Sequence, residues 1–270
     1  MWKLYVESNF LVIYLCFTSE NLQKMLPKEV SLLEYKIFSD SLYNLPQNQK
    51  LIINTINQYS FCIAEQDPEF KEALVESDVL LPDGIAIVGS VKFLGGQSIK
   101  KIAGADIFRH LMVELDKKGG TCFFLGSSEP TLAKIKNKLA RNYPNVQAGF
   151  YSPPYKPAFS KEDSGKMIRA VNDFQPDVLF VGMTAPKQEK WVHAFKNELD
   201  APIVCAIGAV FDFYAGTVDR PKQVWIDMGL EWLVRLYREP KRLWKRYLYY
   251  GPIFVFHIFK RKMGNLNAIS

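Results

Sequence analysis

The feature that most constrains the fold is a regular alternation of short apolar runs with longer segments of helical periodicity, from Lys50 to Ile207. A rhythm of this kind is typical of parallel sheets, because parallel strands need a long, usually helical, connection between them. The apolar runs predict strands at 50–54, 79–81, 121–125, 146–151, 177–181 and 203–207. The sequence therefore predicts an α/β fold with a Rossmann-like, mostly parallel sheet and helices on both faces.

Helices are expected between these strands. The clearest lies at 106–118, where Ile107, Leu111 and Leu115 recur at helical spacing and mark a buried face. The others are placed at 58–76, 84–93, 129–143, 161–173 and 187–197. One main domain with an appendage is expected.

The pattern changes at Gln223. Residues 225–250 are expected to form one long helix, rich in Trp, Tyr and Arg, that ends at Gly251-Pro252. A boundary near Thr217 separates a Rossmann-like catalytic domain at 25–217 from a helical, basic and aromatic appendage at 218–270. A leader of uncertain order, at 1–24, precedes the catalytic domain.

The leader contains an apolar run at 10–17, about half of the roughly 20 residues that span a bilayer. No cleavage site of the small-residue type follows this run, so a signal peptide is not expected. Met25 is an alternative start of the chain. We therefore expect a protein of the cytoplasm, which is also the compartment that the cysteines indicate.

Four cysteines, one of them Cys16, lie far apart and form no C-x-x-C pair, as expected for reduced thiols. The three histidines have no metal-ligand spacing and no Asp-x-Asp pair occurs, so no metal requirement is expected. The G-x-G-x-x-G fingerprint is absent too, which disfavours an NAD enzyme.

The positive charge is concentrated in the appendage. Residues 235–262 hold nine Lys or Arg against one Glu, which leaves the rest of a chain of net charge +6 with a charge of −2. Arg235, Arg238, Arg242 and Arg246 are spaced to share one helix face. An anionic partner is expected: a membrane surface, phosphate groups or nucleic acid. The alternative is a solvated surface helix, but the many aromatic residues favour a segment that lies on a membrane interface.

The strongest candidate for catalysis is Asp83, in the stretch D-V-L-L-P-D-G-I-A-I-V at 78–88. It follows an apolar strand and lies in a Pro-Gly turn, and ligands of open parallel sheets bind outside the carboxyl ends of the strands. A turn aspartate that bonds its own backbone is the alternative. Thr55 and Asn57, at the exit of the preceding strand, favour an active site.

Polar residues also follow later strands. The turn at Gly126 opens a helix whose free N–H groups suit a phosphate, although an ordinary turn fits this sequence as well. Pro186 begins another helix, from which Gln188 and Glu189 can reach a sugar hydroxyl or a base. Asp212 follows the last strand and points toward the same crevice.

A series of motifs, in order from about residue 51 to 247, resembles the WecG/TagA/CpsF family of bacterial glycosyltransferases. The motifs are T-I-N (55–57), L-L-P-D-G-I (80–85), K-I-A-G-A-D (101–106), F-F-L-G-S-S (123–128), V-G-M-T-A-P-K-Q-E-K-W (181–191), F-D-F-Y-A-G (211–216), G-L-E-W-L-V-R-L (229–236) and E-P-K-R-L (239–243).

The resemblance implies an inverting, metal-independent transfer of a hexose or N-acetylhexosamine, such as ManNAc, from a UDP-sugar. The acceptor would be an undecaprenyl-diphosphate-linked sugar in cell-surface polysaccharide synthesis. The UDP-sugar is a substrate, and no cofactor is implied. The enzyme would lie on the inner face of the cell membrane, with an anionic membrane surface as a partner and no nucleic acid. Both a monomer and a homo-oligomer are compatible with the resemblance.

The resemblance also assigns roles to residues. Asp83 looks like the general base, which would take the proton of the acceptor hydroxyl. The implied substrate-binding positions are Thr55, Asn57, Gly84, Lys101, Asp106, Gly126, Tyr155, Pro186, Gln188, Glu189 and Asp212. The implied lipid-diphosphate positions are Arg220, Arg235, Arg238, Arg242 and Arg246. A non-catalytic membrane- or nucleic-acid-binding Rossmann module is the alternative, which the polar strand exits disfavour.

Overall fold

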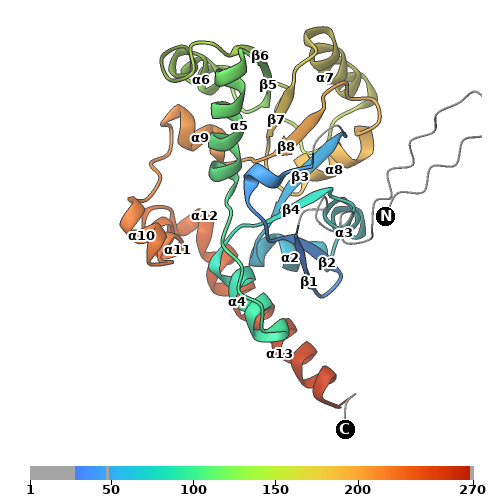
Figure 1. Ribbon diagram of the computed structural model, residues 1–270, viewed down its shortest axis with the longest axis vertical. Helices are drawn as coiled ribbons and strands as arrows, with labels where there is room; N and C mark the ends of the chain where they lie inside the picture. Colours follow the sequence, from blue (N-terminus) through green and yellow to red (C-terminus); the bar gives the residue numbers. More distant parts are fainter. Residues whose placement is uncertain (1–27, 47–48, 268–270) are drawn as a thin grey trace, which may run out of the picture.

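A six-stranded parallel sheet forms the centre of the computed structural model, which describes residues 28–46 and 49–267 (Figure 1). Its strand order is β4-β3-β8-β7-β5-β6. The strands are β3 (Leu51–Ile56), β4 (Val79–Pro82), β5 (Thr121–Gly126), β6 (Gln147–Tyr151), β7 (Val178–Gly182) and β8 (Ile203–Ala206). The predicted parallel α/β fold is confirmed.

Helices cover both faces of the sheet, because successive side chains of a strand point to opposite sides. Phe124 and Phe180 face one cluster, with α5 (Gly104–Lys118), α6 (Glu129–Asn142) and α9 (Val210–Ala215). Leu125 and Leu179 face the other, with α7 (Lys161–Phe174) and α8 (Lys187–Phe195). Alternate residues of β5 and β7 thus contribute to two separate cores.

An antiparallel hairpin, which was not expected from the sequence, lies beside β4. It consists of β1 (Glu29–Leu32) and β2 (Tyr35–Phe38), and a short helix η1 (Leu42–Asn44) follows it. Tyr35 and Ile37 are buried in a third cluster, with Phe61 of α2 (Gln58–Ala64) and residues of α3 (Pro68–Val75) and α4 (Ile85–Gly95).

The single helix expected at 58–76 is wrong, because the structure has two helices there, α2 and α3. Proline has no N–H to continue a helix but suits the first helical turn. Pro68 is that first residue of α3, and the Asp67 side chain caps the helix by accepting from the Phe70 N–H at 3.1 Å.

The single helix expected at 225–250 is also wrong. The region contains α10 (Gln223–Asp227), α11 (Glu231–Arg238), α12 (Pro240–Trp244) and a π-helical segment η2 (Lys245–Tyr249). Gly229 turns the chain between α10 and α11 with φ of 73°, a value that favours glycine. Gly251-Pro252 does not end a helix, because both residues lie in the first turn of α13 (Tyr250–Asn267).

The last helix packs on the Rossmann-like domain. Tyr250, Phe254 and Ile258 of α13 are buried in the hairpin cluster, and the rings of Phe254 and Phe61 meet edge to face at 5.2 Å. Figure 1 shows α13 alongside α4 and then extending away from the sheet.

In the described part of the chain no helix is both long and apolar enough to cross a membrane. Cys62, Cys122 and Cys205 are buried free thiols, as expected. The leader at 1–24, with Cys16, and the alternative start at Met25 lie outside the described residues.

Candidate active site

The carboxyl ends of the central strands open into a cavity of about 960 Å³. Its walls come from loops and helix starts of the sheet domain and from the first half of the appendage. Eleven of the predicted site residues line it: Thr55, Asn57, Asp83, Tyr155, Gln188, Glu189, Asp212, Arg220, Arg235, Arg242 and Arg246. The structure therefore brings together residues from positions 55 to 246 of the chain.

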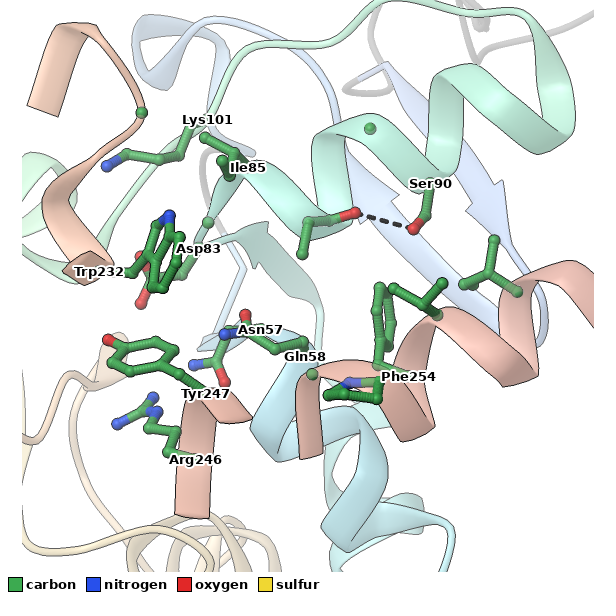
Figure 2. Close-up of a pocket in the computed structure, with 18 of the residues that line it drawn as sticks. Asn57, Gln58, Asp83, Ile85, Ser90, Lys101, Trp232, Arg246, Tyr247 and Phe254 are labelled. Carbon is green, nitrogen blue, oxygen red and sulfur yellow. Dashed lines mark hydrogen bonds between the residues drawn. The ribbon is translucent and has the colours of Figure 1, made fainter. Parts of the chain in front are cut away.

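A second cavity of about 490 Å³ adjoins the first, and Asp83 lines both. This second cavity also includes Gly84 and Lys101, two predicted site residues that do not line the larger one. Figure 2 shows Lys101, Trp232, Tyr247 and Arg246 gathered around Asp83 at one end of it, with Phe254 toward the other.

Asp83 is held where β4 ends, since its backbone N–H donates to the Ile56 carbonyl at 2.9 Å. Burial raises the pKa of the Asp83 carboxyl, and the Glu231 carboxylate raises it further. The positive charges of Arg246, Lys101 and Arg235 oppose this rise. A carboxylate with a raised pKa surrounded by cations is suited to take up a proton during a reaction.

Glu231, which was not predicted as a site residue, connects the appendage to the sheet domain. Its carboxylate pairs with the Lys101 ammonium at 2.9 Å, and the two side chains are only 18% and 20% exposed. Glu231 lies within the G-L-E-W-L-V-R-L motif, but nothing in the motif indicates that residue 231 meets residue 101. Trp232 follows it, and its ring lies 5.9 Å from that of Tyr247 in the cavity wall.

Two appendage arginines are positioned by aromatic rings of the sheet domain. The Arg235 guanidinium lies over Phe213 and that of Arg246 over Tyr59, each 5.2 Å from the ring centroid. Within residues 28–46 and 49–267 neither of the two makes an ion pair, in contrast to Arg242, which is 2.7 Å from Glu239. Arg235 and Arg246 thus offer positive charge to a ligand.

Asn57 supports α2 as well as the cavity wall. Its side-chain oxygen accepts from the N–H groups of Tyr59 and Ser60, both at 3.1 Å, which caps the helix. The residue lines both cavities, as the strand-exit argument predicts.

Gln188 and Glu189 form a buried polar pair at the start of α8. Gln188 accepts from the Met183 N–H at 3.1 Å and donates to Glu189 Oε1 at 2.8 Å. Glu189 Oε2 has no hydrogen-bond partner among the described residues. Burial raises the pKa of Glu189 to about 7, although the bond from Gln188 lowers it.

Asp212 lies on α9 and lines the same cavity as this pair. The Thr217 hydroxyl donates to its carboxylate at 3.3 Å and to its carbonyl at 3.1 Å. Both side-chain types, an amide at 188 and a carboxylate at 212, can form the paired hydrogen bonds that a nucleobase edge requires.

Four predicted positions lie outside the walls of both cavities. The Asp106 carboxylate accepts from the Ala103 N–H at 2.9 Å and so caps α5. A Cβ at Gly126 would lie 2.4 Å from the Gly182 carbonyl oxygen, so glycine is needed there for packing. Pro186 precedes α8 and its carbonyl accepts from the Lys190 N–H at 3.1 Å, and Arg238 donates to the Asp219 carbonyl at 3.1 Å. The geometry gives each of these residues a structural contact.

No group of three His, Cys, Asp or Glu side chains that could hold a metal ion occurs in the described ranges, 28–46 and 49–267.

Comparison with known proteins identifies the family. The model of the WecG/TagA/CpsF glycosyl transferase family matches residues 24–268. A protein of Bacillus spizizenii is 30% identical over 204 residues, which cover 76% of this chain and 77% of the relative. A protein of Bacillus subtilis is 30% identical over 213 residues, covering 78% and 81%. Both relatives are named N-acetylglucosaminyldiphosphoundecaprenol N-acetyl-beta-D-mannosaminyltransferase. The chain belongs to the WecG/TagA/CpsF family of glycosyl transferases.

Proposed function

We propose that this glycosyltransferase moves a hexose or N-acetylhexosamine, ManNAc-like, from a UDP-sugar to an undecaprenyl-diphosphate-linked sugar. The names of the two relatives support the transferred sugar and the acceptor. The observation that carries the proposal is the position of Asp83 between two cavities, next to Lys101, Arg235 and Arg246. A carboxylate close to several cations suits a transfer between two diphosphate-bearing substrates.

In the proposed reaction Asp83 accepts the proton of the acceptor hydroxyl. The hydroxyl oxygen attacks C1 of the donor sugar from the face opposite the UDP. The bond between C1 and the UDP oxygen breaks, the electron pair leaves with UDP, and the configuration at C1 is inverted. The partly buried position of Asp83 favours the protonated product state, because burial raises its pKa.

The departing UDP carries negative charge that needs stabilisation. Arg220 and Arg242 line the larger cavity and, in this proposal, supply positive charge to the UDP without a metal ion. In the same proposal Gln188 and Asp212 hold the uracil ring, and Thr55 and Asn57 hold the donor sugar. Tyr155 is fully exposed at the cavity edge and is placed to cover the bound nucleotide.

We also propose that the appendage lies on the anionic inner face of the cell membrane. Four of its exposed apolar side chains are close in sequence to Lys245, Lys260 and Arg261. These apolar side chains are Leu248, Phe256, Phe259 and Met263. Apolar insertion combined with attraction to anionic lipid is the usual basis of reversible attachment.

The test of the proposed function is transfer itself, with UDP-sugars and an N-acetylglucosaminyl-diphosphate-prenol acceptor. Asp83→Asn is expected to reduce kcat by about 10² to 10⁴, because it removes a general base. Binding of UDP, measured by thermal shift, is expected to stay within about twofold, since the amide keeps the size of the side chain.

The matched control is Asp173→Asn, an exposed carboxylate of α7 that lines neither cavity. It is expected to leave kcat unchanged. Near wild-type turnover in Asp83→Asn would show that Asp83 is not the base. Absence of transfer from every UDP-sugar in the wild-type protein would contradict the proposed reaction.

A further inference from the structure

The second cavity is a groove between α4 and α13, and one of its ends is polar while the other is apolar. Asp83, Lys101 and Arg246 lie at the polar end. The rest of the lining, drawn in part in Figure 2, is mainly apolar and comes from both helices. It includes Ile85, Phe93, Phe254, Val255, Ile258 and Phe259.

Two glycines keep this groove open. Gly89 of α4 and Gly251 of α13 both line it, and a Cβ at either position would have no atom within 4 Å. Glycine inside a helix is unfavourable because of its conformational freedom. Gly89 lies within α4 and has no positive φ, so the backbone conformation does not require glycine there. The absence of a side chain at this position instead leaves the groove open.

The apolar wall of the groove is exposed. Ile85, Phe93, Val255 and Phe259 are each between 42% and 52% exposed, although they face the cavity. The rings of Phe93 and Phe259 meet at 5.1 Å at the far end, with the Lys262 ammonium 5.6 Å above Phe93. A flexible apolar ligand that enters here removes this surface from water.

We propose that this groove binds the first isoprenoid units of the lipid-linked acceptor, with the diphosphate at Lys101, Arg235 and Arg246. This inference rests on the proposed function and assigns the part of the acceptor that the reaction does not change. The order sugar, diphosphate, prenyl chain along the acceptor matches the order Asp83, cations, apolar wall along the groove.

The length of the groove limits what it holds. The eleven residues of α4 extend for about 16 Å, so only the part of the prenyl chain next to the diphosphate fits beside them. The remainder of the chain stays in the bilayer, on which α13 lies in the proposed function. A single phosphodiester headgroup has less charge to match three cations, so a phospholipid is the weaker candidate.

The experiment uses the full chain and a farnesyl diphosphate analogue with a benzophenone at its far end. Illumination and peptide mapping are expected to place the cross-links on residues 85–95 and 250–263. Gly89→Trp fills the groove and is expected to reduce this labelling by about tenfold, which corresponds to losing the burial of roughly two methylene groups. Gly251→Leu fills it from the opposite wall and gives a second, independent variant.

Gly264→Trp is the matched control, because Gly264 is exposed on α13 and does not line the groove. It is expected to leave the labelling unchanged. UDP should raise the Tm of all three variants, Gly89→Trp, Gly251→Leu and Gly264→Trp, as much as it raises that of the wild type. This result would show that the larger cavity is intact. Labelling that neither groove variant reduces, or equal labelling by a benzophenone phospholipid, overturns the proposal.

Kinetics separate this proposal from the proposed function. Gly89→Trp is expected to raise KM for a prenyl-diphosphate acceptor by about tenfold, and KM for a methyl-diphosphate acceptor by less than about twofold. Equal effects on both acceptors contradict the groove while transfer still supports the function. Blocked labelling without transfer to either acceptor contradicts the function and leaves the groove as an isoprenoid site.

Discussion

At the scale of single residues, the environment of Asp83 matters more than its place in a turn. A Pro-Asp-Gly sequence is compatible with an ordinary turn aspartate. In the structure Glu231 raises the pKa of Asp83 and Arg246, Lys101 and Arg235 lower it, and all of these except Lys101 belong to the appendage. The proposed role of Asp83 as a base therefore depends on residues of the appendage.

Glu231→Gln is expected to lower the pKa of Asp83, because it removes a negative charge that raises this pKa and also releases Lys101. The carboxylate then stays ionised to lower pH. In a profile of kcat/KM against pH, the acidic limb should move to lower pH than in the wild type.

Asp227→Asn is the control for this shift, since Asp227 is an exposed carboxylate of the same appendage that lines neither cavity. Its acidic limb should coincide with that of the wild type. A limb that stays in place or moves to higher pH in Glu231→Gln would contradict the role assigned to Glu231.

Glu189 leads to a prediction about stability. Its pKa of about 7 in the folded protein, against 4.5 as the ordinary value, means that folding favours the protonated form. Stability from this group is complete below about pH 4.5 and is lost as the pH rises through about 7. The loss is at most about 3 kcal/mol for such a shift.

Glu189→Gln should remove this pH dependence, because glutamine keeps the shape and has no proton to lose. The difference between the free energies of unfolding at pH 5 and pH 8, from urea titrations, is expected to become smaller. Glu198→Gln, at an exposed position, should keep the wild-type difference. An unchanged difference in Glu189→Gln would show that Glu189 is not buried as described.

At the scale of helices and strands, the six strands of the parallel sheet were predicted well because all of them except β6 are mostly buried apolar runs. Phe123, Phe124 and Leu125, for example, are all buried, and a run of this kind has few alternatives. Helix ends were predicted less well. Apolar spacing continues from α2 into α3 and from α10 into α12, so only Pro68, Gly229 and Pro240 mark the breaks.

The candidate site follows the same division. The strand exits at Thr55, Asp83 and Gln188 were found from sequence because their position depends on local order and on the sheet. The pairing of Glu231 with Lys101 was not found, because it joins residues 130 positions apart. The groove between α4 and α13 was missed as well. The helix expected from the sequence was to end at Gly251-Pro252, which is where α13 begins.

The turn at Gly229, between α10 and α11, sets the position of Glu231. Gly229 has φ of 73°, and a Cβ there would lie 3.2 Å from Ile85. Gly229→Ala is expected to destabilise the turn by about 1 kcal/mol. It should clearly reduce kcat/KM while leaving the global Tm nearly unchanged. The reason is that the turn positions Glu231 and Arg235 against the sheet domain.

Gly95→Ala provides the comparison, since Gly95 has no positive φ and open space around it. This variant should keep both kcat/KM and Tm, or gain slightly in Tm. Equal activities of the two variants would mean that the turn at Gly229 does not control the site.

At the scale of the whole molecule, the appendage contributes both to the proposed membrane-binding surface and to the walls of the candidate active site. Phe256 and Met263 are exposed and line neither cavity, so they test attachment alone. In the double variant Phe256→Ser, Met263→Ser, binding to phosphatidylglycerol vesicles is expected to fall at least about tenfold. Turnover of a water-soluble acceptor should stay at the wild-type level.

The control for attachment is Val75→Ser, Val113→Ser, two exposed valines of the sheet domain. Flotation with anionic vesicles should be unaffected by this pair, and wild-type binding should weaken as salt is added. Equal loss of flotation in both double variants would indicate that the appendage does not provide the membrane contact.

The two cavities that meet at Asp83 have a consequence for turnover. In the proposed reaction each substrate would have its own route to the carboxylate, so both could be present before any bond changes, and no covalent sugar-enzyme stage would be needed between them. Each product would likewise have its own way out: the nucleotide through the larger cavity and the lengthened lipid along the bilayer. The proposed enzyme would then release a glycolipid without moving it into water, and accumulation of UDP would not block the departure of the lipid.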